Sequence, residues 1–212
     1  MKLMMFEHCS LCFRVWMAAA LKGLPLEQQV VEDDDSDAMV SLVGRRVIPI
    51  LVRDDGTPML ESWAMVDHIE SIGGPMLTGP ERPEIAALAA RLLDITPNLT
   101  MPRYPLLPLA EFRTQAARAH FIERKRAAYP DMAGLRARTP DFLAELMPEL
   151  EVLAGQIEAP EAINGTLSRD DLRIVPLLRS VRVVEGLEMP GPVDAYFQAM
   201  MGRVGARPLP RI

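Results

Sequence analysis

The sequence contains few of the residues on which several classes of protein depend. Only two of its 212 residues are cysteines, and aromatic residues make up 5% of the chain. A secreted scaffold held by disulfides would need more cysteines, spread more widely along the chain. The net charge of −6, together with the few aromatics, argues against nucleic-acid binding.

Long apolar runs are also absent. No stretch of about 18 apolar residues occurs, so we expect no membrane span. The first residues lack the apolar run and the small-residue cleavage site of a signal peptide. Because the scarcity of cysteine favours a reducing compartment, we expect a cytoplasmic protein.

The chain does contain enough apolar residues for a core, since 49% of it is hydrophobic. In the first 72 residues, strand and helix signals follow the order βαβ, then α, then a ββ hairpin, then α, as in a thioredoxin-like domain. Residues 73–82 carry Gly-Gly-Pro and Thr-Gly-Pro breakers. Beyond them apolar residues recur at helical spacing, for example from Ile85 to Leu93. We predict an α/β domain over residues 1–72, a linker over 73–82 and an all-α domain over 83–212.

The two cysteines stand between the first predicted strand and the first predicted helix. The free N–H groups and the positive dipole of a helix start favour a thiolate, the reactive form, at Cys9. Cys12 lies one turn further along, so the two sulfurs can meet on one helix face. We predict a redox pair with Cys9 as nucleophile and Cys12 as resolving thiol. Chance spacing is one alternative, and a structural zinc site is another. Zinc would need four ligands, and no second cysteine pair exists, so we expect no metal.

Ile48-Pro49 opens a β-branched run. Proline cannot donate to a sheet ladder, so a trans proline at a strand start or edge is one interpretation. A cis bond is the other, and it would leave the backbone N–H and C=O of Ile48 exposed beside the cysteines. Those groups can then pair with an extended peptide, as a neighbouring strand would.

Glu61-Ser62 opens the next predicted helix, and two interpretations stay open. Ser62 can act as an ordinary N-cap. Alternatively, the free N–H groups and the Ser62 hydroxyl can bind a carboxylate, while Glu61 accepts bonds from an α-amino group. The second arrangement would hold an amino-acid end such as a γ-glutamyl group.

The middle of the chain is basic. Residues 101–138 carry eight basic and three acidic side chains. This stretch can bind a small anion, or it can form a solvated helix face, which is the commoner case.

Cys9-x-x-Cys12, Ile48-Pro49 and Glu61-Ser62, followed by a helical half, resemble the bacterial glutaredoxin 2 family. Three later stretches also match: Pro75–Gly79, Asn164–Ser168 and Pro176–Arg179. The resemblance implies a glutathione transferase fold, with a thioredoxin-like N-terminal domain and a helical C-terminal domain. It implies a glutaredoxin, a glutathione-dependent thiol–disulfide oxidoreductase that reduces glutathione mixed disulfides and protein disulfides.

The resemblance also implies roles for the motif residues. Cys9 would attack and Cys12 would resolve, Ile48 with Pro49 would hold the cysteinyl part of glutathione, and Glu61 with Ser62 would hold its γ-glutamyl end. Glutathione would be a co-substrate, with no bound cofactor. The partners would be glutathionylated or disulfide-containing proteins, and we expect a monomer. The glycyl carboxylate of glutathione would be a candidate partner for Arg45 or Arg46.

The chain departs from the family between its cysteines, where Ser10 and Leu11 replace the usual Pro and Tyr. This departure leaves reaction rate, redox potential and preferred substrate open. Two other functions remain alternatives. A glutathione transferase that conjugates electrophiles would share the fold, and its activity would survive loss of Cys9. A non-catalytic glutathione-binding module would have an ordinary thiol and no turnover.

Overall fold

The computed structural model describes residues 1–212, which form two compact units. The first unit contains residues 1–74 and 105–130, and the second contains residues 75–104 and 131–212. The boundaries inferred from the sequence for independently folding domains stay a prediction. The structure adds that residues 105–130 belong with the N-terminal part.

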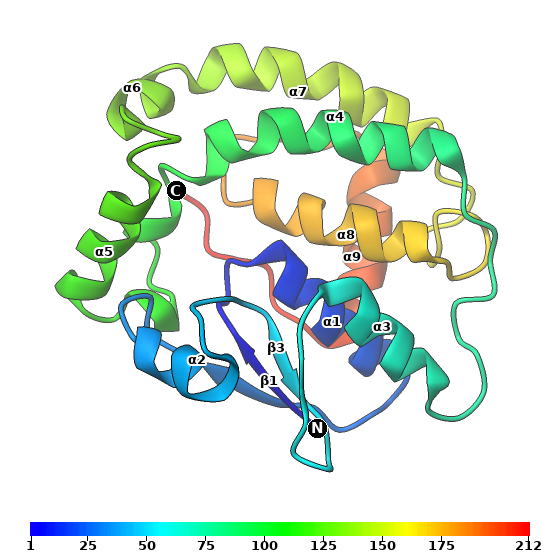
Figure 1. The fold of residues 1–212 in the computed structure, drawn as a ribbon. Coiled ribbons are helices and arrows are strands. Elements are labelled where there is room, and N and C mark those ends of the chain that lie inside the picture. Colours follow the sequence, from blue (N-terminus) through cyan, green and yellow to red (C-terminus); the bar gives the residue numbers. More distant parts are fainter. The chain divides into compact units, whose positions relative to one another are not determined.

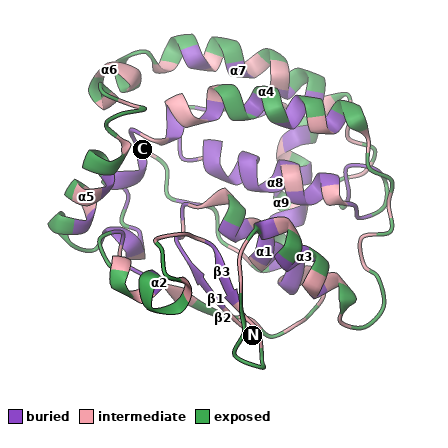
Figure 2. Ribbon diagram, in the orientation of Figure 1, coloured by how far each residue is buried: buried purple, intermediate pink, exposed green.

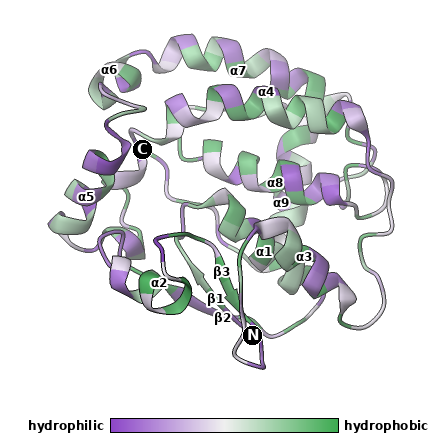
Figure 3. Ribbon diagram, viewed as in Figure 1, coloured by the Kyte–Doolittle hydropathy of each residue, from purple (hydrophilic) through white to green (hydrophobic).

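A four-stranded mixed sheet organises the first unit. Its strands are β1 (Lys2–Met5), β2 (Glu27–Val30), β3 (Ile50–Val52) and β4 (Pro58–Met59), in the spatial order β2-β1-β3-β4. β1 pairs in parallel with β2 and antiparallel with β3, which in turn pairs antiparallel with β4. β1 and β3 are mostly hydrophobic (Figure 3) and buried (Figure 2), as expected for central strands covered on both faces.

Helices cover the two faces of this sheet. They are α1 (Ser10–Leu21), α2 (Ser36–Val43) and α3 (Ser62–Ser71). Met39 of α2 joins Met4 and Ile50 in one apolar cluster on one face. Because side chains alternate along a strand, Leu3 and Leu51 point to the other face, where α1 packs beside α3 (Figure 1). This arrangement confirms the predicted thioredoxin-like domain.

Local contacts and residue types set the bounds of three elements of this unit. α1 begins at Ser10, because the Cys9 sulfur accepts the Cys12 N–H and so caps the helix. β3 begins at Ile50, directly after Pro49, which has no N–H to donate to the sheet. α2 ends at Gly44, which adopts the left-handed conformation at φ 74°.

The second unit consists of helices. These are α4 (Pro83–Thr100), α6 (Met132–Ala137), α7 (Thr139–Ala154), α8 (Arg169–Val181) and α9 (Gly191–Val204). α4 packs against α7 and α8, and α8 also contacts α9. The predicted apolar stripe on α4 is buried from Ile85 to Leu92, but Leu93 at its edge is 50% exposed. No helix of either unit has the length and hydropathy that crossing a bilayer requires.

The start of α8 is held by a buried carboxylate. Asp171 accepts hydrogen bonds from the backbone N–H groups of Ser168 and Ile163 and from the hydroxyl of Tyr196, each at 2.8 Å. Ser168 and Asp171 form a capping box. The same carboxylate therefore joins the helix start, the preceding loop and α9.

We expect the substitution Asp171→Ala to lower the free energy of unfolding by about 3 kcal/mol, because it leaves three buried donors without an acceptor. Asp141→Ala is the matched control. Asp141 occupies the same position in the first turn of α7, but it is exposed and bonds only the exposed Arg138. Its removal should cost less than about 1 kcal/mol. Urea unfolding measures both changes, and equal losses would contradict this account of α8.

Candidate functional site

Cys9 occupies the turn between β1 and α1. Its backbone N–H donates to the carbonyl of Phe6 at 3.2 Å, and its own carbonyl accepts the N–H of Phe13 at 3.0 Å. These bonds fix the sulfur at the helix start, where it accepts the backbone N–H of Cys12 at 3.3 Å. Cys9 is partly exposed, Cys12 is fully buried, and both are free thiols.

The two thiols differ in acidity. Hydrogen bonding with the Cys12 thiol, aided by the charge of His8 and by the N–H groups of Cys12 and Leu11, outweighs the effect of burial and lowers the pKa of Cys9 to about 7. Burial, followed by the effects of Cys9, raises the pKa of Cys12 well above its usual value. At neutral pH the exposed sulfur is therefore partly ionised, while the buried one keeps its proton as a donor.

Ile48 and Pro49 lie close to this turn. Ile48 and Cys9 both pack against the apolar cluster that contains Phe6 and Ile50. The Ile48–Pro49 peptide bond is cis. No hydrogen bond within the chain uses the backbone N–H or C=O of Ile48. The structure thus brings together Cys9, Cys12 and the unpaired backbone of Ile48.

Glu61 and Ser62 form the start of α3, but not as an ordinary cap. Ser62 is the first helical residue, so the interpretation of Ser62 as N-cap is wrong. Glu61 holds the capping position with φ 67°, and its side chain makes no capping bond. It is the only non-glycine residue with positive φ, a conformation that costs energy and is often found at functional sites.

Ser62 is connected to the first helix. Its hydroxyl oxygen accepts a hydrogen bond from Arg14 Nη1 of α1 at 2.9 Å, and the Arg14 guanidinium lies 4.2 Å from the centre of the Trp63 ring. Because the arginine occupies an acceptor position of the hydroxyl, the Ser62 O–H remains a donor. The helix start thus combines uncapped N–H groups, a hydroxyl donor and the exposed Glu61 carboxylate.

Residues 105–130 complete the first unit through contacts that sequence reasoning missed. Asp33, which is fully buried, forms ion pairs with Arg46 at 3.2 Å and with Arg124 at 2.9 Å, and a hydrogen bond with His120 at 2.8 Å. His120 and Arg124 belong to α5 (Gln115–Lys125). The basic excess of residues 101–138 was the only signal. The solvated-face interpretation fails for Arg124, since its charge meets a buried carboxylate.

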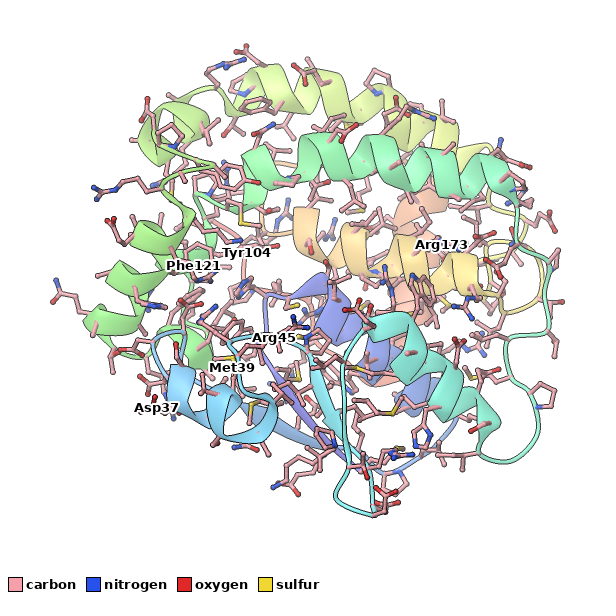
Figure 4. All side chains as sticks on the ribbon, in the orientation of Figure 1. Asp37, Met39, Arg45, Tyr104, Phe121 and Arg173 are labelled. Atoms are coloured by element: carbon pink, nitrogen blue, oxygen red, sulfur yellow. The ribbon has the colours of Figure 1, made fainter.

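The arginines after α2 also differ in role. Arg46 is committed to Asp33, and it lies 5.6 Å from the Phe6 ring centre. Burial alone would raise the pKa of Asp33, but its bond with His120 and the charges of Arg124 and Arg46 lower it below its usual value. Arg45 is exposed, in the loop after α2, the helix that carries Met39 (Figure 4). Of the two candidate partners for a glycyl carboxylate, only Arg45 makes no ion pair within the chain.

Comparison with known proteins first defines the class. Residues 8–72 match the glutathione S-transferase N-terminal domain. The maleyl pyruvate isomerase structure, a bacterial zeta-class glutathione S-transferase, has a TM-score of 0.59 at 20% identity, covering 95% of this chain and 92% of that one. The chain therefore has the predicted glutathione transferase fold.

Further matches define the family within this class. Residues 84–209 match the glutaredoxin 2 C-terminal domain. Glutaredoxin 2 of Escherichia coli strain K12 is 34% identical over 197 residues, which is 92% of each chain. Glutaredoxin 2 of Salmonella typhimurium, solved in complex with glutathione, has a TM-score of 0.95 at 31% identity, covering 98% of this chain and 96% of that one. This chain belongs to the glutaredoxin 2 family, as its motifs predicted.

We expect alkylation of Cys9 by iodoacetamide to rise with pH around a midpoint near 7, because the thiolate is the reactive form and its pKa is about 7. Below that pH the proton returns and the reaction slows. Cys12 should stay unlabelled over the same range, since it is buried and its pKa is raised. Tandem mass spectrometry of the peptide locates the label.

Two variants of Cys12 test the main cause of the lowered pKa. Cys12→Ala removes the side-chain donor and should move the Cys9 midpoint upward, whereas Cys12→Ser keeps an O–H donor and should move it less. Identical midpoints in the two variants would show that the side-chain hydrogen bond does not set the acidity of Cys9.

Proposed function

We propose that this chain is a glutathione-dependent thiol–disulfide oxidoreductase that acts through Cys9 and Cys12. One observation carries the proposal: a partly exposed sulfur at a helix start, with lowered pKa, receives hydrogen bonds from a buried second thiol residue three positions later. Such a sulfur is a nucleophile at neutral pH. Membership of the glutaredoxin 2 family supports the same activity.

The proposed reaction is a pair of exchanges. The Cys9 thiolate attacks the glutathione sulfur of a mixed disulfide, and the protein sulfur leaves as a thiolate that takes up a proton. The thiolate of a second glutathione then attacks the glutathione sulfur on Cys9, which releases glutathione disulfide and restores the Cys9 thiolate. With a protein disulfide as substrate, Cys12 loses its proton and displaces the bound protein from Cys9, forming the Cys9–Cys12 disulfide.

The residues around the thiol provide a holder for glutathione in this proposal. The unpaired backbone of Ile48, fixed next to Pro49, would pair with the cysteinyl part of glutathione. The N–H groups at the start of α3 and the Ser62 hydroxyl would bind the γ-glutamyl carboxylate, with Arg14 adding positive charge behind the hydroxyl. Glu61 would accept hydrogen bonds from the α-amino group.

The same chemistry defines the partners we propose. They are glutathione and glutathionylated or disulfide-containing proteins. A monomer suffices, because Cys9, Cys12, Ile48 and Ser62 all come from one unit of one chain. Turnover needs a pool of reduced glutathione, so we propose a reducing compartment such as the cytoplasm.

We expect Cys9→Ser to abolish glutathione-coupled reduction of a mixed disulfide, because a serine hydroxyl cannot replace the thiolate as nucleophile. Cys12→Ser should keep this activity and lose the reduction of protein disulfides that needs both thiols. Coupling to glutathione reductase and NADPH consumption measures each reaction. Full activity of Cys9→Ser would contradict the proposal, and conjugation of an electrophile by that variant would favour a glutathione transferase instead.

A pair of substitutions at Glu61 separates ligand binding from stability. Glu61→Gln should raise the KM for glutathione about tenfold, because a charge-assisted hydrogen bond to the amino group is lost. Glu61→Gly should raise it at least as much, while the free energy of unfolding stays within about 1 kcal/mol, since glycine accepts positive φ. Glu70→Gln is the matched control on the same helix. Glu70 pairs with Lys22, and its loss should leave KM unchanged.

A further inference from the structure

The His8 ring, next to Cys9 in the chain, is enclosed by aromatic side chains. It stacks on Phe6 at 5.6 Å and on Phe112 at 5.4 Å between ring centres, with interplanar angles of 9° and 19°. The Phe121 ring meets it edge-on at 5.5 Å. Phe112 and Phe121 come from the segment 105–130 (Figure 4 labels Phe121 on α5). The ring is therefore buried and fixed in orientation.

Glu111, which lies 103 positions further along the chain, makes two hydrogen bonds with His8. Its Oε1 atom accepts the backbone N–H of His8 at 2.9 Å and lies 2.7 Å from His8 Nδ1. Glu111 is fully buried, and its Oε2 atom has no hydrogen-bond partner. Burial alone would raise the pKa of Glu111, but its bonds with His8 and the His8 charge lower it below its usual value. The contacts with His8 thus favour the ionised form of this buried carboxylate.

The two members of this pair act on the thiols with opposite sign. The charge of His8 lowers the pKa of Cys9, whereas the charge of Glu111 raises the pKa of Cys12. A negative charge near a thiolate opposes its formation, and a positive charge favours it. If Glu111 favours the Cys9 thiolate, it must therefore do so through His8.

We propose that Glu111 is a positioning residue for the Cys9 thiolate, which it supports by holding the His8 imidazolium in place and charged. A cation enclosed by three phenylalanine rings loses its hydration, and a paired carboxylate offsets that cost. This inference rests on the proposed role of Cys9 as nucleophile.

Other charged groups surround the site and stay unchanged in the test. Arg46 lies over Phe6 and Arg124 over Phe121, and both are paired with Asp33. Lys125 on α5 is close enough for the charge of Cys9 to act on it. Glu7 accepts the backbone N–H of Ala110 at 2.7 Å, so it connects the same turn to the same segment.

The test is the pH profile of Cys9 alkylation in Glu111→Gln. The direction in which its midpoint shifts decides whether Glu111 acts through His8. If Glu111 acts through His8, the midpoint rises by about 0.5–1 pH unit, and alkylation well below the midpoint slows about three- to tenfold. If Glu111 acts on the thiolate directly, or only supports packing, the midpoint falls or stays where it is, which would overturn the proposal. Glu7→Gln is the matched control, and it should produce no upward shift.

A second substitution tests whether the effect of Glu111 on Cys9 depends on His8. In a His8→Asn background, where the positive charge is already absent, Glu111→Gln should no longer raise the midpoint. A rise of the same size in that background would overturn the proposal. If wild-type Cys9 itself titrates as an ordinary thiol, the proposed role of Cys9 as nucleophile fails. If the wild-type midpoint is low but Glu111→Gln leaves it unchanged, only the positioning role of Glu111 is refuted.

A measurement on the unaltered protein does not depend on whether a Glu111 variant folds. Nitrogen chemical shifts of the His8 ring report its protonation during a pH titration. The proposal requires a doubly protonated ring throughout the range in which Cys9 ionises. A neutral ring in that range would overturn it.

Discussion

Cys9 occupies the position before the first turn of α1, where most helices place a serine, threonine, aspartate or asparagine to accept the free N–H groups. Here a sulfur accepts the Cys12 N–H instead. Holding the helix start and favouring the thiolate are therefore one interaction. The ionised sulfur is the better acceptor, so the structure that α1 requires at its N-terminus is also the reactive state of the residue. His8 precedes this residue in the chain, and Ile48 packs against the same apolar cluster as Cys9.

The surroundings of the thiol are made from two distant parts of the chain. Residues 105–130 supply Glu111, Phe112, Phe121 and Arg124 to the unit that contains Cys9. Asp33 gathers Arg46, His120 and Arg124, so one buried carboxylate faces two guanidinium groups and an imidazole. Such a cluster leaves surplus positive charge near the aromatic rings beside Cys9. That surplus favours an anion at the site.

Much of the fold and part of the site were predictable because their signals are local. The Cys-x-x-Cys spacing, the Ile-Pro pair and the alternation of strands and helices all lie within short windows, and they led to the fold and family. Cys9 caps α1 although cysteine is not a usual capping residue, whereas Ser62 does not cap α3 although serine is one. The pairs Glu111–His8 and Asp33–His120 join residues 103 and 87 positions apart. Charge counts show that such groups exist, but not which of them meet.

The path of the chain has a consequence for how this protein can be divided. It crosses from one unit to the other three times, after residues 74, 104 and 130. A fragment cut after residue 74 would keep Cys9 and the sheet, but it would expose Asp33 without His120 and Arg124, and His8 without Glu111. The two units are thus not exchangeable modules. A chimera that joins the first unit to a different helical domain would therefore have to include α5 and the residues that precede it.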